Sequence, residues 1–557
     1  MKLFRSDSSD SQNKRTKTAY IGGIFRRFAR LTRFNPLQNR IFLWALTAAL
    51  AGFLFGFDTV VISGADKTIQ SLWQLSPITH GLAMSMALWG TVLGSMAGGV
   101  PTDRWGRKRT LLLIGMLYLA SAIWSALAND VYSFMIARFI GGIGVGISTV
   151  AAPLYISEIS PAKSRGWLAG LFQFNIVFGI LVAMISNSIF SGFEGNGWRW
   201  MLGAEAVPAI AYTLLCFSLP NSPRWLMAVK QDRMAAEKVL AKVNPDLDAA
   251  AVASLADSIG RSLESRPSAL GFWSAQLKKP ITLAFLIAFF NQLSGINIIM
   301  YFAPRLLGLA GFQNEFSTAI ALGLVNLIFT MAGLWLIDRL GRKSLLLIGS
   351  VGYIVSLGVC GWAFLNNADF RVISAADSVI ERVESVSKLE QTDYREVPES
   401  EMSKANQELQ KAKEQLSSLT PNMFDLDDEG SEALASATEV KQKVSERLGS
   451  SKWIVLTSLL AFIASHAIGQ GAVIWVFISE IFPNAHRAAG QALGCFTHWI
   501  FAAVLTLLFP IVIANVDPGW LFLFFCGMMV LQLFWVLLMV PETKGISLEQ
   551  IEQQLSA

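Results

Sequence analysis

The sequence predicts an all-α membrane protein with twelve transmembrane helices in two six-helix halves. Three observations support this fold class. Hydrophobic residues make up 53% of the 557 residues and charged residues only 15%, whereas charged residues are about 25% of ordinary soluble domains. Twelve apolar runs are each long enough to cross a bilayer, which takes about 20 residues. Two motifs from the first half of the chain recur in the second half.

The twelve apolar runs follow one another along the chain with two longer polar interruptions, after the sixth run and after the ninth. Each run carries few charged residues and is bounded by polar or basic loops. We expect the spans at 41–64, 80–102, 110–128, 131–156, 165–190, 199–219, 280–303, 315–338, 344–366, 453–480, 488–513 and 519–540.

Basic residues set the predicted orientation. Residues 1–40 contain ten Lys and Arg against two Asp, and the loops that follow the second, fourth and eighth spans are also basic. Loops rich in Lys and Arg stay in the cytoplasm. The sequence therefore predicts a multi-pass protein of the cell inner (plasma) membrane, with a basic N-terminal tail (1–40) and a C-terminal tail (541–557) that are both cytoplasmic.

An internal repeat divides the spans into two halves. The segment from Asp103 to Lys108, DRWGRK, recurs as DRLGRK from Asp338, and YISEISP, which begins at Tyr155, recurs as FISEIFP from Phe477. Parallel repeats of six spans are a transporter architecture, in which substrate lies between the halves near the middle of the membrane. We expect halves at 41–219 and 280–540, joined by a cytoplasmic helical linker at 220–279.

The spacing of the repeats reveals an insertion. The first pair of motifs is 235 residues apart and the second 322, so the second half is longer by 322 − 235 = 87 residues. Composition locates the extra residues at 366–452, a polar stretch with 18 acidic and 11 basic residues, net −7. It lies outside the cytoplasm in the predicted topology. A solvated helical hairpin is the favoured interpretation, and a lid or a surface for an unknown partner is the alternative.

Several functional classes are excluded. A net charge of +5 gives little support to nucleic-acid binding. The four cysteines all lie inside apolar runs, which is typical of small buried side chains and not of a disulfide framework or a metal site. The sequence lacks a phosphate-binding loop, a His/Cys metal-ligand cluster and a nucleophile elbow. We expect no metal, no other cofactor and no enzyme activity.

Polar residues inside the spans are the candidate functional residues. Asp58 lies in the middle of the first span, where an unpaired carboxylate is costly, and Arg138 in the fourth span is its expected partner. Intramembrane amides likewise need a partner or a water-filled cavity, and many serve only to join helices. Gln292 and Asn297 are favoured as site residues because they lie five residues apart where Gly295 is expected to break the helix.

Together these motifs resemble the sugar porter family of the major facilitator superfamily. The resemblance covers the chain except for the N-terminal tail and the insertion. Besides the two repeated loops, it rests on GFDTVVISG from Gly56, RFIGGIGVG from Arg138, PNSPRW from Pro220, QLSGIN from Gln292 and PETKG from Pro541.

The resemblance implies a sugar site between the two halves. Amides can donate to and accept from sugar hydroxyls, and aromatic rings can pack against the apolar face of a sugar. His498 stands where relatives often have an amide, and Asn291 where many have a glutamine, which leaves the sugar, hexose or pentose, open. The residues that fall at sugar-site positions are Gln173, Asn291, Gln292, Asn297, Asn326, Trp475, His498 and Trp499.

The resemblance also implies a proton switch and a cytoplasmic gate. In proton-coupled relatives an aspartate and an arginine that match Asp58 and Arg138 form the proton switch, whereas facilitative relatives tend to have asparagine at the first position. Repeated charged residues resemble the salt-bridge network that holds the halves together when the site opens outward. These are Asp103, Arg107, Glu158, Arg165, Asp338, Arg342, Glu480 and Arg487.

The sequence thus supports three functions. The first is a transporter that imports a monosaccharide with a proton, alternating access between the two sides of the bilayer. The second is a facilitative sugar carrier, in which Asp58 is structural. The third is a sugar sensor that uses the 366–452 insertion as its output surface. Asp58 separates the first two, because it takes part in proton coupling in the first and is structural in the second.

Overall fold

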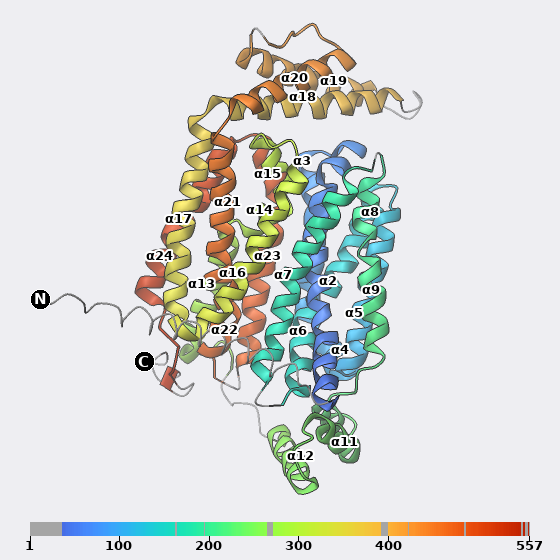
Figure 1. Cartoon of the computed structure of the whole chain (residues 1–557), viewed down its shortest axis with the longest axis vertical. Helices are drawn as coiled ribbons and strands as arrows, with labels where there is room; N and C mark the ends of the chain where they lie inside the picture. The colour runs from blue at the N-terminus through green and yellow to red at the C-terminus, as the bar shows by residue number, and fades with distance from the viewer. Residues whose placement is uncertain are drawn as a thin grey trace, which may run out of the picture.

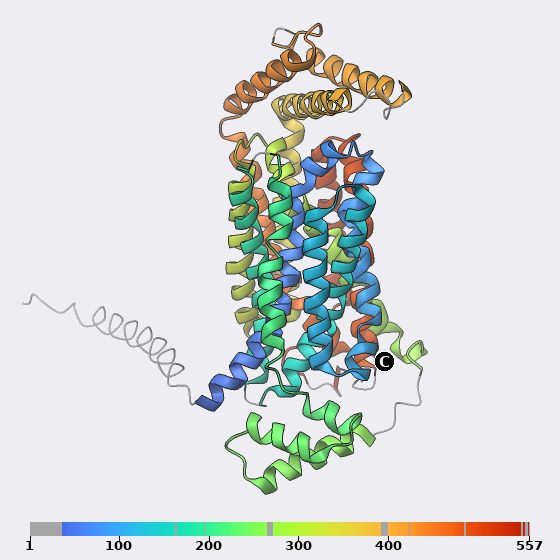
Figure 2. The same ribbon diagram turned by 90° about the vertical axis from the view of Figure 1, so that its right-hand side faces the viewer.

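A bundle of upright helices forms the body of the protein, with smaller helical groups at its two ends (Figures 1 and 2). The computed structural model describes residues 36–161, 164–193, 195–264, 271–391, 399–421, 423–483, 486–546, 550–551 and 555, and its regular elements there are all helices. Residues 1–35 of the predicted N-terminal tail lie outside the described residues, as does most of 547–557.

The N-terminal half contains six spans. Each of the first five is built around one long helix, with the short α4 continuing the second, and the sixth is broken into two helices beside Ala204 and Glu205. The helices are α2 (Pro36–Leu72), α3 (Pro77–Ala97), α4 (Gly99–Arg104), α5 (Arg107–Leu127), α6 (Val131–Ile159), α7 (Arg165–Phe190), α8 (Gly197–Gly203) and α9 (Ala206–Cys216).

The C-terminal half contains the other six spans, and two of them are broken. The seventh consists of three helices and the tenth of two. The helices are α13 (Lys278–Leu293), α14 (Ile296–Tyr301), α15 (Ala303–Leu309), α16 (Glu315–Leu340), α17 (Arg342–Asn366), α21 (Ser451–Ile468), α22 (Gln470–Ile481), α23 (Arg487–Ile513) and α24 (Pro518–Met539).

This arrangement agrees with the predicted twelve-span fold. By length and apolar character, ten segments of the described chain could each cross a membrane. The remaining two spans are α3, which includes the polar His80, and the pair α8 and α9, which are individually short. The first span is longer than predicted: α2 continues past residue 64 to Leu72.

Two groups of helices lie outside the bundle. The linker holds α10 (Pro223–Ala228), α11 (Arg233–Val243), α12 (Ala249–Glu264) and η1 (Ala275–Leu277). Between α17 and α21 the insertion folds into α18 (Ala368–Gln391), α19 (Glu399–Leu419) and α20 (Gly430–Arg447). These groups lie at opposite ends of the bundle (Figure 1), which we call the linker end and the insertion end.

The two halves meet along α3 with α23 and α7 with α16. The helices approach closely at Gly81 of α3, where a Cβ atom would lie 2.1 Å from the carbonyl oxygen of Leu507 on α23. Polar contacts also join the halves near the insertion end: the hydroxyls of Ser188 and Ser317 are 3.0 Å apart, and Lys67 Nζ lies 3.7 Å from Glu315 Oε1. The halves are therefore closed against each other at the insertion end.

We predict that Gly81→Ala opens this seam. A backbone carbonyl 2.1 Å from the added methyl group cannot be accommodated without movement, and overpacking of this kind costs about 1–3 kcal/mol. Spin labels at the exposed residues Ser191 and Asn366 should then report a longer distance between the halves. The control is Gly170→Ala on α7, where a Cβ would have open space. An unchanged distance in Gly81→Ala would contradict the prediction.

Candidate functional site

A break in the seventh span brings two amide side chains together. Gly295 lies between α13 and α14 with φ +85°, a conformation that L side chains rarely adopt. A Cβ there would also lie 2.7 Å from the ring of Phe525. Across this break Asn297 Nδ2 donates to Gln292 Oε1 at 2.7 Å, so the predicted helix break and the proximity of the two amides are confirmed.

Gln292 is the centre of a buried polar cluster. Its Nε2 lies 3.0 Å from Asn291 Oδ1 and 3.0 Å from the ring Nδ1 of His498 on α23. Asn291 and Gln292 are only 2% and 1% exposed. The cluster thus joins the broken seventh span to the eleventh, with amide groups that can act as donors or acceptors.

Aromatic rings surround this polar cluster. The ring of His498 lies 5.3 Å from that of Trp475 on α22 and 4.7 Å from that of Trp499, centroid to centroid. Trp499 Nε1 is buried without a hydrogen-bond partner among the described residues. The ring of Phe55, from α2 of the other half, packs against that of Trp499, with 5.6 Å between the ring centroids. Sequence reasoning missed Phe55, although it lies in the run that contains Asp58.

Two predicted site residues are not hydrogen-bonded to this cluster among the described residues. Asn326 on α16 is buried and accepts from Thr330 Oγ1 at 3.4 Å. Gln173 on α7 is half-buried. Within the described part of the chain, no hydrogen bond connects either of them to Gln292.

The predicted Asp58–Arg138 pair is present and buried. Arg138 Nη1 donates to Asp58 Oδ1 at 2.5 Å, and Nη2 donates to the Asp58 carbonyl oxygen at 3.0 Å. Both residues are 1% exposed. A guanidinium with this many contacts to one residue is held in a fixed position between α2 and α6.

Glu205 is a second buried carboxyl group beside this pair. It lies in the break between α8 and α9, is 1% exposed, and is close enough to Asp58 and Arg138 to interact with both electrostatically. Neither of its oxygens has a hydrogen-bond donor among the described residues. One guanidinium therefore faces two carboxyl groups, and a proton shared between them would supply the missing donor. Sequence reasoning overlooked Glu205, although it is an acidic residue inside a predicted span, as Asp58 is.

Charged residues at the linker end form one matching pair in each half. Arg107 Nε and Nη2 both lie 3.0 Å from the two oxygens of Glu158, and Arg342 makes the same bidentate contact to Glu480 at 3.1 and 2.8 Å. Asp103 and Asp338 lie 3.2 and 3.3 Å from the same arginines. Each pair is internal to its half, so the repeat seen in the sequence is also a repeat in space.

Of the two remaining predicted gate residues, only Arg487 has a described side chain. Arg487 has two guanidinium nitrogens, Nε and Nη2, that are buried without a hydrogen-bond partner in the described chain, and the side chain of Arg165 lies outside the described part. Glu542, which was not predicted, accepts from the backbone N–H groups of Arg342 and Lys343 at 2.9 and 3.1 Å. Over the described residues, no ion pair joins the two halves at the linker end.

Comparison with known proteins gives the family. The profile described as "Sugar (and other) transporter" matches residues 44–379 and 434–555. The chain belongs to the sugar porter family of the major facilitator superfamily. It is a multi-pass membrane transporter and not an enzyme. The residues between the two matched segments, 380–433, fall within the insertion.

Individual relatives align over nearly the whole chain. A probable metabolite transport protein of Bacillus subtilis, CsbC, is 31% identical over 93% of this chain and 95% of its own length. The galactose-proton symporter of Escherichia coli is 29% identical over 92% and 94%. Among solved structures, the inward-open conformation of the xylose transporter XylE from Escherichia coli matches with a TM-score of 0.68 at 27% identity, over 92% of this chain and 99% of the other.

We predict that the two buried carboxyl groups differ in their effect on stability. Asp58→Asn removes the main partner of a buried guanidinium, which should lower the free energy of unfolding by about 3 kcal/mol or more. Glu205→Gln supplies an amide donor to Asp58 and should lower it by less than about 1 kcal/mol. Thermal unfolding in detergent measures both variants, and equal destabilisation would contradict the assigned arrangement.

Proposed function

We propose that the protein imports a monosaccharide together with a proton. The observation that carries the proposal is the spacing of two sites on α2. Phe55 contacts the aromatic and amide cluster, and Asp58 pairs with Arg138 only three residues further on. Three residues correspond to less than one helical turn, about 4.5 Å along the axis. A change at the proton site is thus transmitted through one rigid helix to the sugar site.

The amide and aromatic cluster is suited to a neutral, hydroxyl-rich solute. Gln292, Asn291, Asn297 and His498 offer donors and acceptors without a fixed net charge, and Trp475 and Trp499 flank them. We assign these residues to the sugar site, with Gln173 and Asn326 as further members that reach the sugar when the halves move. The relatives named for galactose and xylose support a hexose or a pentose as substrate.

The cluster of Asp58, Arg138 and Glu205 is the proposed proton site. With one positive group and two carboxyl groups, the cluster is neutral when one proton is bound. Protonation of Asp58 weakens its attraction to Arg138, which frees α2 to move relative to α6. Because an unpaired charge inside the membrane is costly, proton binding and the change in helix packing are expected to occur together.

In alternating access, the closed end of the bundle opens and the open end closes. We propose that the linker end is cytoplasmic, with both chain termini there, because the basic loops lie at that end. The halves are joined at the insertion end, and among the described residues no ion pair joins them at the linker end, so we propose that this conformation opens towards the cytoplasm. In the opposite state, Arg107, Arg342 and their acidic neighbours would form contacts across the halves, as bistable interfaces require.

Proton coupling is tested by uptake of radiolabelled sugars into proteoliposomes, with and without an inward proton gradient. We expect the gradient to drive accumulation by the wild-type protein. Asp58→Asn and Glu205→Gln should still equilibrate sugar but lose accumulation. In Asp58→Asn the residue at position 58 is always neutral, and in Glu205→Gln Asp58 stays paired with Arg138 throughout the cycle. If all three proteins equilibrate sugar identically and ignore the gradient, the protein is a facilitative carrier. Binding without uptake would instead favour the sensor.

Sugar recognition is tested by Gln292→Ala. The variant removes the residue that connects Asn291, Asn297 and His498, and two or more lost hydrogen bonds should raise the KM for uptake roughly 10- to 100-fold. The matched control is Gln410→Ala, an exposed glutamine of α19 that bonds only to Glu414 in the described chain. A KM that stays within about two-fold of the wild-type value would remove Gln292 from the site.

A further inference from the structure

We infer that the insertion is a latch: it travels with the C-terminal half and holds the N-terminal half against it when the outer side is closed. The inference rests on the proposed transport cycle, in which the halves separate at the insertion end. It assigns a function to α18–α20, most of which lies outside the family profile. The observations that support it are an apolar anchor on one half and polar contacts with the other.

The anchor lies on the C-terminal half and is apolar. The ring of Phe370 on α18 is 4.8 Å from that of Phe364 on α17. Ile373 and Leu448 pack so tightly on Gly311, after α15, that a Cβ there would lie 3.1 and 2.8 Å from their methyl groups. All three apolar side chains of the insertion are at most 3% exposed. Separating these surfaces would expose buried apolar area, so the insertion and the C-terminal half move as one body.

The insertion is also cohesive in itself. α18 packs against both α19 and α20, with Leu416 and Val440 among the buried residues between them. Ion pairs tie the same helices together: Lys441 Nζ lies 2.5 Å from Asp377 Oδ1, and Arg382 Nη1 lies 2.5 Å from Glu408 Oε2. A force applied at one edge of the insertion is therefore carried to its anchor.

Contacts with the N-terminal half are polar. Gln74, in the turn between α2 and α3, donates from Nε2 to the carbonyl oxygen of Ser385 on α18 at 3.1 Å. Gln74 has φ +50°, a left-handed conformation that is uncommon for a residue with a side chain and that holds its amide towards the insertion. A single hydrogen bond of this kind can be broken and remade at little cost, because water replaces the lost partner.

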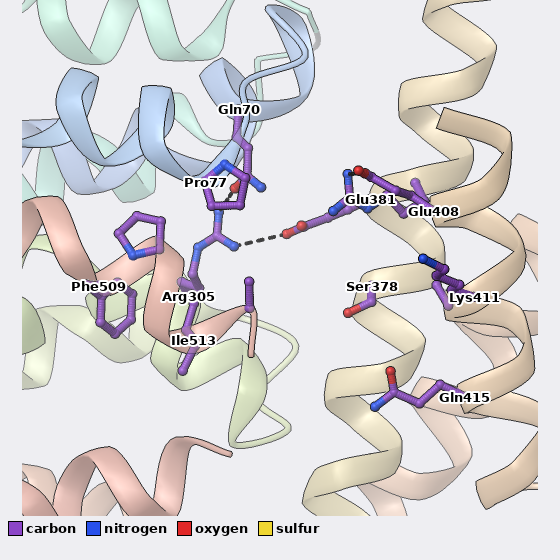
Figure 3. Close-up of a pocket in the computed structure, with 14 residues that line it drawn as sticks. Gln70, Pro77, Arg305, Ser378, Glu381, Glu408, Lys411, Gln415, Phe509 and Ile513 are labelled. Atoms are coloured by element: carbon purple, nitrogen blue, oxygen red, sulfur yellow. Dashed lines mark hydrogen bonds and ion pairs between the residues drawn. The ribbon is translucent and has the colours of Figure 1, made fainter. Parts of the chain in front are cut away.

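Arg305 of α15 connects the insertion to the closed seam. It donates to Asp66 Oδ2 at 2.6 Å and to Gln70 Oε1 at 2.5 Å, both on α2, and to Glu381 Oε1 on α18 at 3.2 Å. The Asp66 side chain is 2% exposed, and its other oxygen lies 2.9 Å from His80 Nε2. Figure 3 shows the Arg305 guanidinium between Gln70 and Glu381, with one dashed contact on each side.

A cavity of about 300 Å³ separates the rest of the insertion from the bundle beside Arg305. Its lining comes from both halves and from the insertion, with Gln70 and Pro77 facing Ser378, Lys411 and Gln415 across it (Figure 3). The insertion thus lies over the seam without being packed onto all of it. This leaves few contacts to break when the N-terminal half moves away.

These contacts determine which conformation the insertion stabilises. When the halves separate, Asp66, Gln70 and Gln74 leave with the N-terminal half, while Arg305, Glu381 and Ser385 stay with the C-terminal half. The Gln74–Ser385 bond exists only in the closed state, and the Glu381–Arg305 pair becomes solvated and weaker in the open state. The insertion therefore favours the conformation that is closed at its own end.

Tethering tests the latch directly. In a variant whose four cysteines are replaced by alanine, Gln74→Cys and Ser385→Cys are joined by a short cleavable bis-thiol reagent. We expect uptake to fall at least roughly ten-fold, as for a blocked conformational step, and to recover on cleavage. The matched control joins Arg371→Cys to Asp517→Cys, an insertion contact within the C-terminal half at 3.8 Å, and should leave uptake unchanged. Undiminished uptake with the first tether, or equal block by both, would overturn the inference.

A second measurement needs no sugar, so it separates failure of the latch from failure of the proposed transport function. Spin labels are placed at Ser191 of the N-terminal half and Ser418 of α19, both exposed. In Gln74→Ala the population at longer distance should increase roughly five-fold, the size expected for one lost hydrogen bond. Gln410→Ala is the control. Identical distance distributions in Gln74→Ala and the wild type would overturn the latch even if sugar uptake is confirmed.

Discussion

The absence of hydrogen-bonding solvent inside a bilayer determines where this protein can place its polar side chains. A buried charge or amide in a span needs a partner from another helix, and each partner found here fixes two helices relative to each other. Asp58 and Arg138 join α2 to α6, and Gln292 and His498 join α13 to α23. In the proposed cycle, the polar groups that bind the proton and the sugar are therefore also groups that define helix packing, and changing a proton or a ligand at one of them would change that packing.

The two halves are repeats of each other but carry different chemistry. The bidentate arginine–glutamate pair occurs in both, with nearly equal distances. The buried ion pair with a second carboxyl group belongs to the N-terminal half, whereas the amide cluster belongs to the C-terminal half. Phe55 on Trp499 is the contact between these two regions. In the proposed cycle, this division would let a proton act on one half and a sugar on the other, with their coupling confined to the surface where the halves meet.

Much of this was predictable because the bilayer makes local sequence informative. Apolar length predicted the spans, a glycine between two amides predicted the broken seventh span, and an aspartate within an apolar run predicted the pair with Arg138. Glu205 satisfies the same criterion as Asp58, so the sequence contained its signal. Phe55 could not be singled out, since the chain has 37 phenylalanines and only the approach of α2 to α23 distinguishes this one. The group of Asp66, His80, Arg305 and Glu381 was also beyond sequence reasoning, because it draws on four helices that are distant in the chain.

The effect of the insertion depends on which helices it connects. The predicted solvated hairpin is a group of three helices. Its polar surface would suit a domain that is only solvated or a domain that holds a gate closed. The helices between which it is inserted distinguish these two alternatives. Since α17 and α21 both belong to the C-terminal half, an insertion there is carried by that half in every state of the cycle. Its α18 nevertheless lies against α2 of the other half. A domain fixed to one body and resting on the other adds to the free-energy difference between the closed and open states. Gln74 and Glu381 therefore contribute to that difference from outside the proposed sugar and proton sites.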